Sequence, residues 1–121
     1  SGLSRANRAS PRTVVALLSA MHASTLGPVF RSSLAVAGRT GTVRRRLRGT
    51  PAAGDCRAKT GTLNGVSNLA GLCTGADGHT LAFAILMNGV TVWRAHEAQD
   101  RAAAAIAAFD SLPFRHRLPT D

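Results

Sequence analysis

CRAKTGTLNGVSNLAGLC, residues 56–73, is the segment that decides the fold, because it holds a turn signal between two strand-like stretches. Asn64-Gly65 is the strongest short signal for a β-hairpin, since both residues tolerate the positive φ of a type I′ turn. With a two-residue loop at this point, two residues face each other when their numbers add up to the same total as those of Asn64 and Gly65. Leu63 therefore lies opposite Val66. The segment therefore predicts two antiparallel strands in a defined register.

The two cysteines of the chain fit that register, which places Cys56 opposite Cys73. At a non-hydrogen-bonded pair their Cα atoms would be about 4.5 Å apart, within the range of a disulfide. The alternative is a pair of free, buried thiols that behave as small apolar groups. A disulfide is favoured, and it would indicate an oxidising compartment. Zinc is not expected, because His79 is the only histidine nearby and the cysteines lack CxxC spacing.

A third strand and two helices are predicted outside the hairpin. Residues 79–88 follow a second turn signal at Asp77-Gly78 and are apolar on both faces, which is typical of a central, covered strand. Ser10-Pro11 offers a cap and a first helical residue for a helix within 7–24. The alanine-rich stretch 94–109 predicts a second helix.

The middle of the chain, residues 29–53, is rich in glycine, proline and arginine and predicts irregular structure, with a short helix near 43–47. Four arginines lie close together there: Arg44, Arg45, Arg46 and Arg48. The net charge of +9 suits an anionic partner. The arginine run has no interleaved aromatic residues for base stacking, so we interpret it as a solvated basic surface and expect no nucleic-acid partner.

The bulk composition indicates one domain. The chain has 121 residues, of which 45% are apolar, and this is enough for a buried core. No run of eighteen apolar residues predicts a membrane span. The chain starts at Ser1 without a signal segment, so we expect a processed or truncated product. A helix, an antiparallel meander and a second helix predict an α+β fold, with helices packed on an antiparallel sheet.

The residues after the single lysine, Lys59, point to anion binding. A lysine offers a compact charge with three donors, and the hydroxyls of Thr60 and Thr62 can donate to the same anion. Gly61 removes a side chain from the strand, so another backbone can lie close. Together they would suit an extended peptide with a free carboxylate. Lys59 and Thr60 alternate in direction, so one of them must act from the strand edge. The alternative is an exposed lysine in a polar strand.

Residues 58–71, with their Lys-Thr-Gly strand, resemble the third signature of the active-site serine penicillin-binding proteins and β-lactamases. SGLSRAN at 1–7, the longer stretch 38–71 and FAILMNG at 83–89 extend the similarity to the class C D-alanyl-D-alanine carboxypeptidases, peptidase family S13. The resemblance implies that residues 1–109 are the C-terminal part of a penicillin-binding, transpeptidase-like domain. Residues 110–121 are left as a tail.

What the resemblance implies is hydrolysis through a serine acyl-enzyme. A serine attacks the penultimate D-Ala carbonyl of a peptidoglycan stem peptide that ends in D-Ala-D-Ala, the last D-Ala leaves, and water hydrolyses the acyl-enzyme. The implied activity is that of a carboxypeptidase, with endopeptidase activity as a further option, and β-lactams mimic the substrate. No cofactor is implied. Ser1 and Leu3 would line the substrate cleft, Leu3 as part of an apolar wall.

The same resemblance assigns roles to the Lys-Thr-Gly strand. Lys59 would assist proton relay and attract the substrate carboxylate, which the hydroxyls of Thr60 and Thr62 would bind. Gly61 would leave room for the substrate. The backbone N–H of Thr62 would be one donor of the oxyanion hole.

Two expected motifs of this family are missing from the chain. Ser-x-x-Lys is absent because the only lysine is Lys59 and the residue three before it is Cys56, and Ser-x-Asn is absent as well. We therefore expect an active enzyme only together with an N-terminal segment or a second chain, located outside the cytoplasm in the periplasm or cell wall. The alternatives are a β-lactamase of the same superfamily and a non-catalytic basic module that binds an anionic polymer.

Overall fold

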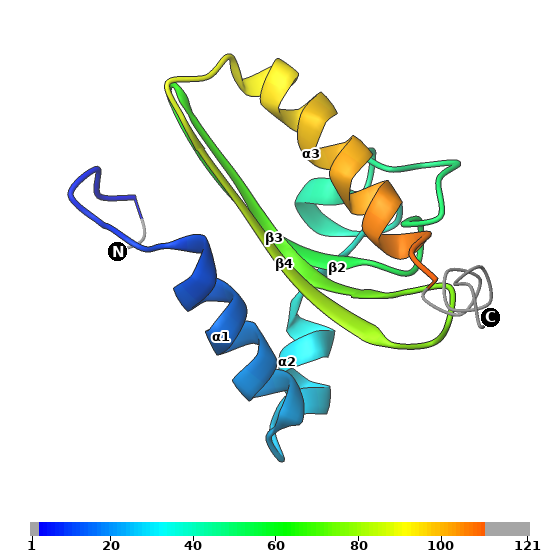
Figure 1. The fold of residues 1–121 in the computed structure, drawn as a ribbon. Helices are drawn as coiled ribbons and strands as arrows, with labels where there is room; N and C mark the ends of the chain where they lie inside the picture. Colours follow the sequence, from blue (N-terminus) through cyan, green and yellow to red (C-terminus); the bar gives the residue numbers. More distant parts are fainter. Residues whose placement is uncertain (1–2, 111–121) are drawn as a thin grey trace, which may run out of the picture.

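A four-stranded antiparallel sheet separates helix α1 from helix α3 in the computed structural model, which describes residues 3–110 (Figure 1). The strands are β1 Ala35–Val36, β2 Arg57–Leu63, β3 Val66–Thr74 and β4 Thr80–Asn88, in the order β1-β2-β3-β4. The helices are α1 Pro11–Ala23, α2 Gly27–Ser33 and α3 Val92–Ala107. This arrangement confirms the predicted α+β class. Ser1 and most of the expected tail lie outside the described residues.

The N-terminal helix begins as the sequence predicts. The Ser10 hydroxyl accepts the backbone N–H of Thr13 at 3.1 Å, and Pro11 occupies the first turn. The expectation of irregular structure after residue 29 is wrong in part, because Gly27 and Pro28 begin α2. Proline is tolerated there, since the first N–H groups of a helix have no partner within the helix.

The central hairpin has the predicted register. β2 and β3 pair from Leu63 opposite Val66 onwards, and Cys56 and Cys73 form a disulfide with a Cα–Cα distance of 4.1 Å. The predicted turn type is wrong. Gly65 has a φ of 74° but Asn64 has no positive φ, whereas a type I′ turn requires both. The loop length, which sets the register, is independent of this detail.

The strand expected to be central, β4, is the edge of the sheet within residues 3–110. Its two apolar faces are covered by α1 on one side and α3 on the other (Figure 1). Apolar residues on both faces therefore reflect the two helix layers and say nothing about strand neighbours. The second hairpin, from β3 to β4, is confirmed, with Thr74 opposite Thr80.

The core lies between the sheet, α3 and the long segment that precedes β2. Val43, Ala52 and Leu69 are completely buried in it, and the disulfide sits in the same cluster. The segment expected to form a short helix near 43–47 instead has a single 3-10 turn over Gly41–Val43. None of the helices within residues 3–110 is long and apolar enough to cross a membrane.

Candidate functional site: the open edge of strand β2

The backbone of β2 has an open edge at two of the predicted site residues. The Ala37 N–H donates to the Cys56 carbonyl at 2.9 Å, so this carbonyl is directed to the β1 side of β2. Backbone direction repeats every two residues, so Thr60 and Thr62 present their N–H and C=O groups to the same side. β1 pairs with β2 no further than Ala58. Within the described part of the chain no strand therefore pairs with Thr60 or Thr62 on this side.

The side chain of Lys59 starts on one face of the sheet and reaches the open edge of β2. It is exposed and lies across from Ala70, on the side of the sheet that α1 covers. Its ammonium group donates to the backbone carbonyl of Thr60, one of the groups at the open edge. The positive charge of Lys59 therefore lies beside the open backbone edge at Thr60.

Thr60 is half-buried on the face of the sheet that it shares with Ala58 of the core. Its hydroxyl lies 2.8 Å from the hydroxyl of Thr42, in the 3-10 turn Gly41–Val43. Sequence reasoning did not find Thr42. The two threonines are 18 residues apart, and only the path of the segment between them brings them together.

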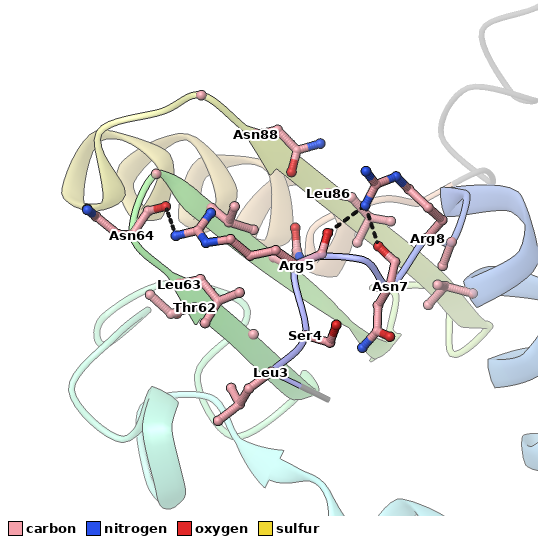
Figure 2. Close-up of a pocket in the computed structure, with 17 residues that line it drawn as sticks. Leu3, Ser4, Arg5, Asn7, Arg8, Thr62, Leu63, Asn64, Leu86 and Asn88 are labelled. Carbon is pink, nitrogen blue, oxygen red and sulfur yellow. Dashed lines mark hydrogen bonds between the residues drawn. The ribbon is translucent and has the colours of Figure 1, made fainter. Parts of the chain in front are cut away.

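A groove of about 780 Å³ opens beside the end of β2 (Figure 2). Three predicted site residues line it: Leu3, Gly61 and Thr62. A Cβ added at Gly61 would have no atom nearer than 3.8 Å, and that atom belongs to Asn68. Packing among the described residues therefore does not require a glycine at position 61. The absence of a side chain there leaves space on the groove side. Lys59 and Thr60 do not line the groove, and Ser1 lies outside the described residues.

The N-terminal segment forms one wall of the groove. Arg5 Nη2 donates to the Asn64 carbonyl at the hairpin turn at 2.9 Å (Figure 2). Arg8 Nη1 donates to the carbonyls of Arg5 and Asn7, at 2.7 and 2.9 Å. Leu3 is 69% exposed on the same segment. The turn residue that fixes the hairpin register thus also anchors the groove wall, a contact that no sequence spacing indicated.

Arg46, from the arginine run, is anchored within the protein. Its guanidinium donates to the Asp100 carboxylate at 2.7 Å and to the Gln99 side-chain carbonyl at 3.1 Å. The expectation of a solvated basic surface is therefore wrong for this arginine. Partial burial, with the nearby Arg46 charge, lowers the pKa of His96, and Asp100 opposes that shift.

Asp55 stands next to the disulfide. Burial raises the pKa of Asp55, and the Thr74 N–H that donates to its carboxylate opposes the shift. Asp55, Cys56 and Cys73 lie close enough to share an ion. Both sulfurs are bonded to each other, however, and are not available as the thiolate ligands that a zinc ion would need.

Comparison with known proteins gives a consistent result. Residues 1–111 match the D-Ala-D-Ala carboxypeptidase 3 (S13) family. The D-alanyl-D-alanine carboxypeptidase of Actinomadura sp. (strain R39) is 40% identical over 114 residues, which are 90% of this chain and 21% of that protein. The D-alanyl-D-alanine carboxypeptidase DacB of Haemophilus influenzae is 37% identical over 91 residues, 74% of this chain and 19% of that protein.

Solved structures show the same likeness. The crystal structure of penicillin-binding protein 4 (dacB) from Haemophilus influenzae matches with a TM-score of 0.79 and 31% identity, covering 90% of this chain and 26% of that one. A complex of that protein with a β-lactam matches with a TM-score of 0.71 and 34% identity, covering 82% of this chain and 25% of that one. The chain thus spans about a fifth of the length of the curated relatives it matches. It belongs to the D-Ala-D-Ala carboxypeptidase 3 (S13) family.

Proposed function

We propose that this chain is the C-terminal part of a serine-type D-Ala-D-Ala carboxypeptidase, with endopeptidase activity as a variant of the same chemistry. Its substrate would be a peptidoglycan stem peptide that ends in D-Ala-D-Ala. The observation that carries the proposal is the open edge of β2 at Thr60 and Thr62, next to the Lys59 ammonium. An extended peptide can add to such an edge through main-chain hydrogen bonds.

The residues at the edge suit the end of that peptide. The ammonium of Lys59 and the hydroxyls of Thr60 and Thr62 would bind the terminal carboxylate, since all three donate hydrogen bonds. The Thr62 N–H, directed to the open side, would donate to the oxygen of the carbonyl under attack. Such a donor is typically worth about 3 kcal/mol of transition-state stabilisation. Gly61 and Leu3 would make room for the peptide and pack against it in the groove.

The reaction that these groups would support is acyl transfer. A serine hydroxyl gives up its proton as its oxygen bonds to the penultimate D-Ala carbonyl carbon, the C–N bond breaks, and the terminal D-Ala leaves as an amine that takes up that proton. Water then adds to the acyl-enzyme and releases the shortened peptide. Lys59 would assist proton relay. A β-lactam would acylate the same serine and remain attached.

The nucleophile must come from outside these 121 residues, since Ser-x-x-Lys is absent. Two features support a further segment or chain that completes the domain. β4 is nine residues long and apolar on both faces, yet it is a sheet edge within residues 3–110, and such edges favour pairing with another strand. The second feature is the exposure of two apolar side chains, Leu17 and Val29, which are 61% and 68% exposed. A further segment would cover them.

The disulfide and the proposed substrate agree on location. A Cys56–Cys73 bond is stable in an oxidising compartment, and peptidoglycan lies outside the cytoplasm. We therefore place the enzyme in the periplasm or cell wall, as a secreted penicillin-binding hydrolase.

A chimera tests the proposal. Residues 1–111 of this chain would replace the matching segment of the Actinomadura carboxypeptidase, and intact-mass spectrometry would follow incubation with penicillin. We expect one penicillin adduct on the chimera and none on the isolated chain. The matched control is Lys59→Ala in the chimera, which should lose most of the adduct and of D-Ala release. A folded chimera that gains no adduct would contradict the proposal.

A further inference from the structure

We infer that Thr42 is a positioning residue for carboxylate binding: its hydroxyl donates to Thr60, so that the single hydroxyl proton of Thr60 is directed to the ligand. The inference rests on the proposed function of the β2 edge and adds to it a group from a different segment. Thr42 itself does not have to touch the ligand.

The contact between the two hydroxyls carries the argument. Thr42 Oγ1 and Thr60 Oγ1 are 2.8 Å apart, the distance of a direct O–H···O hydrogen bond. A hydroxyl has one proton, so only one of the pair can donate to the other. If Thr60 donated to Thr42, it would present only lone pairs to an anion. An anion at Thr60 therefore selects the opposite direction, in which Thr42 donates to Thr60 and Thr60 donates to the carboxylate. A chain of two such bonds polarises and strengthens each member.

The 3-10 turn holds Thr42 in place from both sides. Val43 is completely buried, and its carbonyl accepts the Gly38 N–H at 2.9 Å. The Thr40 hydroxyl accepts the Val36 N–H at 2.8 Å. Gly41 has a φ of 59°, and a Cβ there would lie 2.7 Å from the Ala35 side chain. The residues on either side of Thr42 are thus fixed by burial, by hydrogen bonds and by the lack of space.

Arg46 connects this segment to α3 and to the sheet. Its guanidinium binds Asp100 at 2.7 Å and the side-chain carbonyl of Gln99 at 3.1 Å. Gln99 is completely buried, and its side-chain amide donates to the Ser67 carbonyl at 3.1 Å. Ser67 is the cross-strand partner of Thr62. Gln99 of α3 therefore links the segment that holds Thr42 to β3, the strand that pairs with β2 at Thr62.

The test is an NMR titration of the full chain with N-acetyl-D-Ala-D-Ala and, separately, with the same peptide capped as a C-terminal carboxamide. For the wild-type chain, we expect the Thr60 and Thr62 amides to shift with the acid. In Thr42→Val, which keeps the shape and removes the hydroxyl, we expect about threefold to tenfold weaker binding of the acid. Binding of the carboxamide should not change. Thr42→Ser should restore the affinity, and Thr42→Val should have no further effect on Thr60→Val.

Thr80→Val is the matched control, because Thr80 is an exposed threonine at the start of β4. A Thr42→Val variant that binds the acid as tightly as the wild type overturns the inference. So does a variant that loses acid and carboxamide binding equally, since a merely structural role would act on both peptides. A wild-type chain whose Thr60 and Thr62 amides do not shift also overturns it, and the penicillin adduct of the chimera then decides the proposed function separately.

Discussion

Arg46 and Asp100 form an ion pair at 2.7 Å that joins segments 54 residues apart in the chain. The side chains are only 13% and 26% exposed, so solvent screens the pair less than it would at an open surface. The same guanidinium also satisfies the side-chain carbonyl of the fully buried Gln99. The pair is therefore part of the connection between the long segment before β2 and helix α3.

Arg46→Met should destabilise the protein by about 2 kcal/mol, because the Asp100 carboxylate and the Gln99 carbonyl both lose a charged donor. Urea unfolding followed by circular dichroism measures the change. The control is Arg45→Met, at an exposed position in the same run, which should change the free energy of unfolding by less than about 0.5 kcal/mol. Equal effects of the two substitutions would show that the ion pair contributes nothing particular to stability.

Loss of the disulfide should also lower the stability. The Cys56–Cys73 bond has a sequence separation of 17 residues, and a bond that closes a loop of this size is worth about 3 kcal/mol. We expect dithiothreitol to lower the urea midpoint of the wild type and to leave a Cys56→Ala/Cys73→Ala variant unchanged. Intact mass should rise by about 2 Da on reduction, from the two added protons and electrons. An unchanged midpoint in fully reduced wild type would contradict the prediction.

The central hairpin could be predicted because two independent features, the turn residues and the cysteine positions, require the same register. The turn type could not, since Asn64-Gly65 is compatible with positive φ at both residues or only at the second. The edge position of β4 was missed because the hydrophobicity of a strand indicates whether its two faces are covered. It does not indicate whether another strand pairs with each of its edges. Thr42, Arg46 and the Arg5–Asn64 contact were missed for a different reason: each bond joins distant segments, and no local periodicity encodes it.

Substitution by alanine should destabilise the protein at one glycine of the hairpin and leave its stability nearly unchanged at another. A Cβ at Gly71 would lie 2.0 Å from the Arg57 carbonyl oxygen, so Gly71→Ala should cost about 3 kcal/mol of stability or more. At Gly61 the nearest atom would be 3.8 Å away, so Gly61→Ala should leave the free energy of unfolding within about 0.5 kcal/mol. In the chimera, however, Gly61→Ala should slow penicillin acylation, because the methyl group fills the space beside the strand edge. Urea unfolding and the rate of adduct formation separate the two effects. A stable Gly71→Ala variant would contradict the close approach of β2 and β3 at this point.

The stability of the chain should fall as the pH drops below about 6.5, because of His96. Burial and the Arg46 charge lower the pKa of His96 from its ordinary value of 6.5. The unfolded chain therefore binds a proton at His96 at a higher pH than the folded chain does, and acidification favours unfolding. This contribution is fully present above pH 6.5 and is lost as the pH falls through the lower pKa of the folded state. Urea midpoints at pH 7.5 and 5.5 measure the difference, and His96→Gln should reduce it. A pH dependence that survives His96→Gln unchanged would assign the effect to another group.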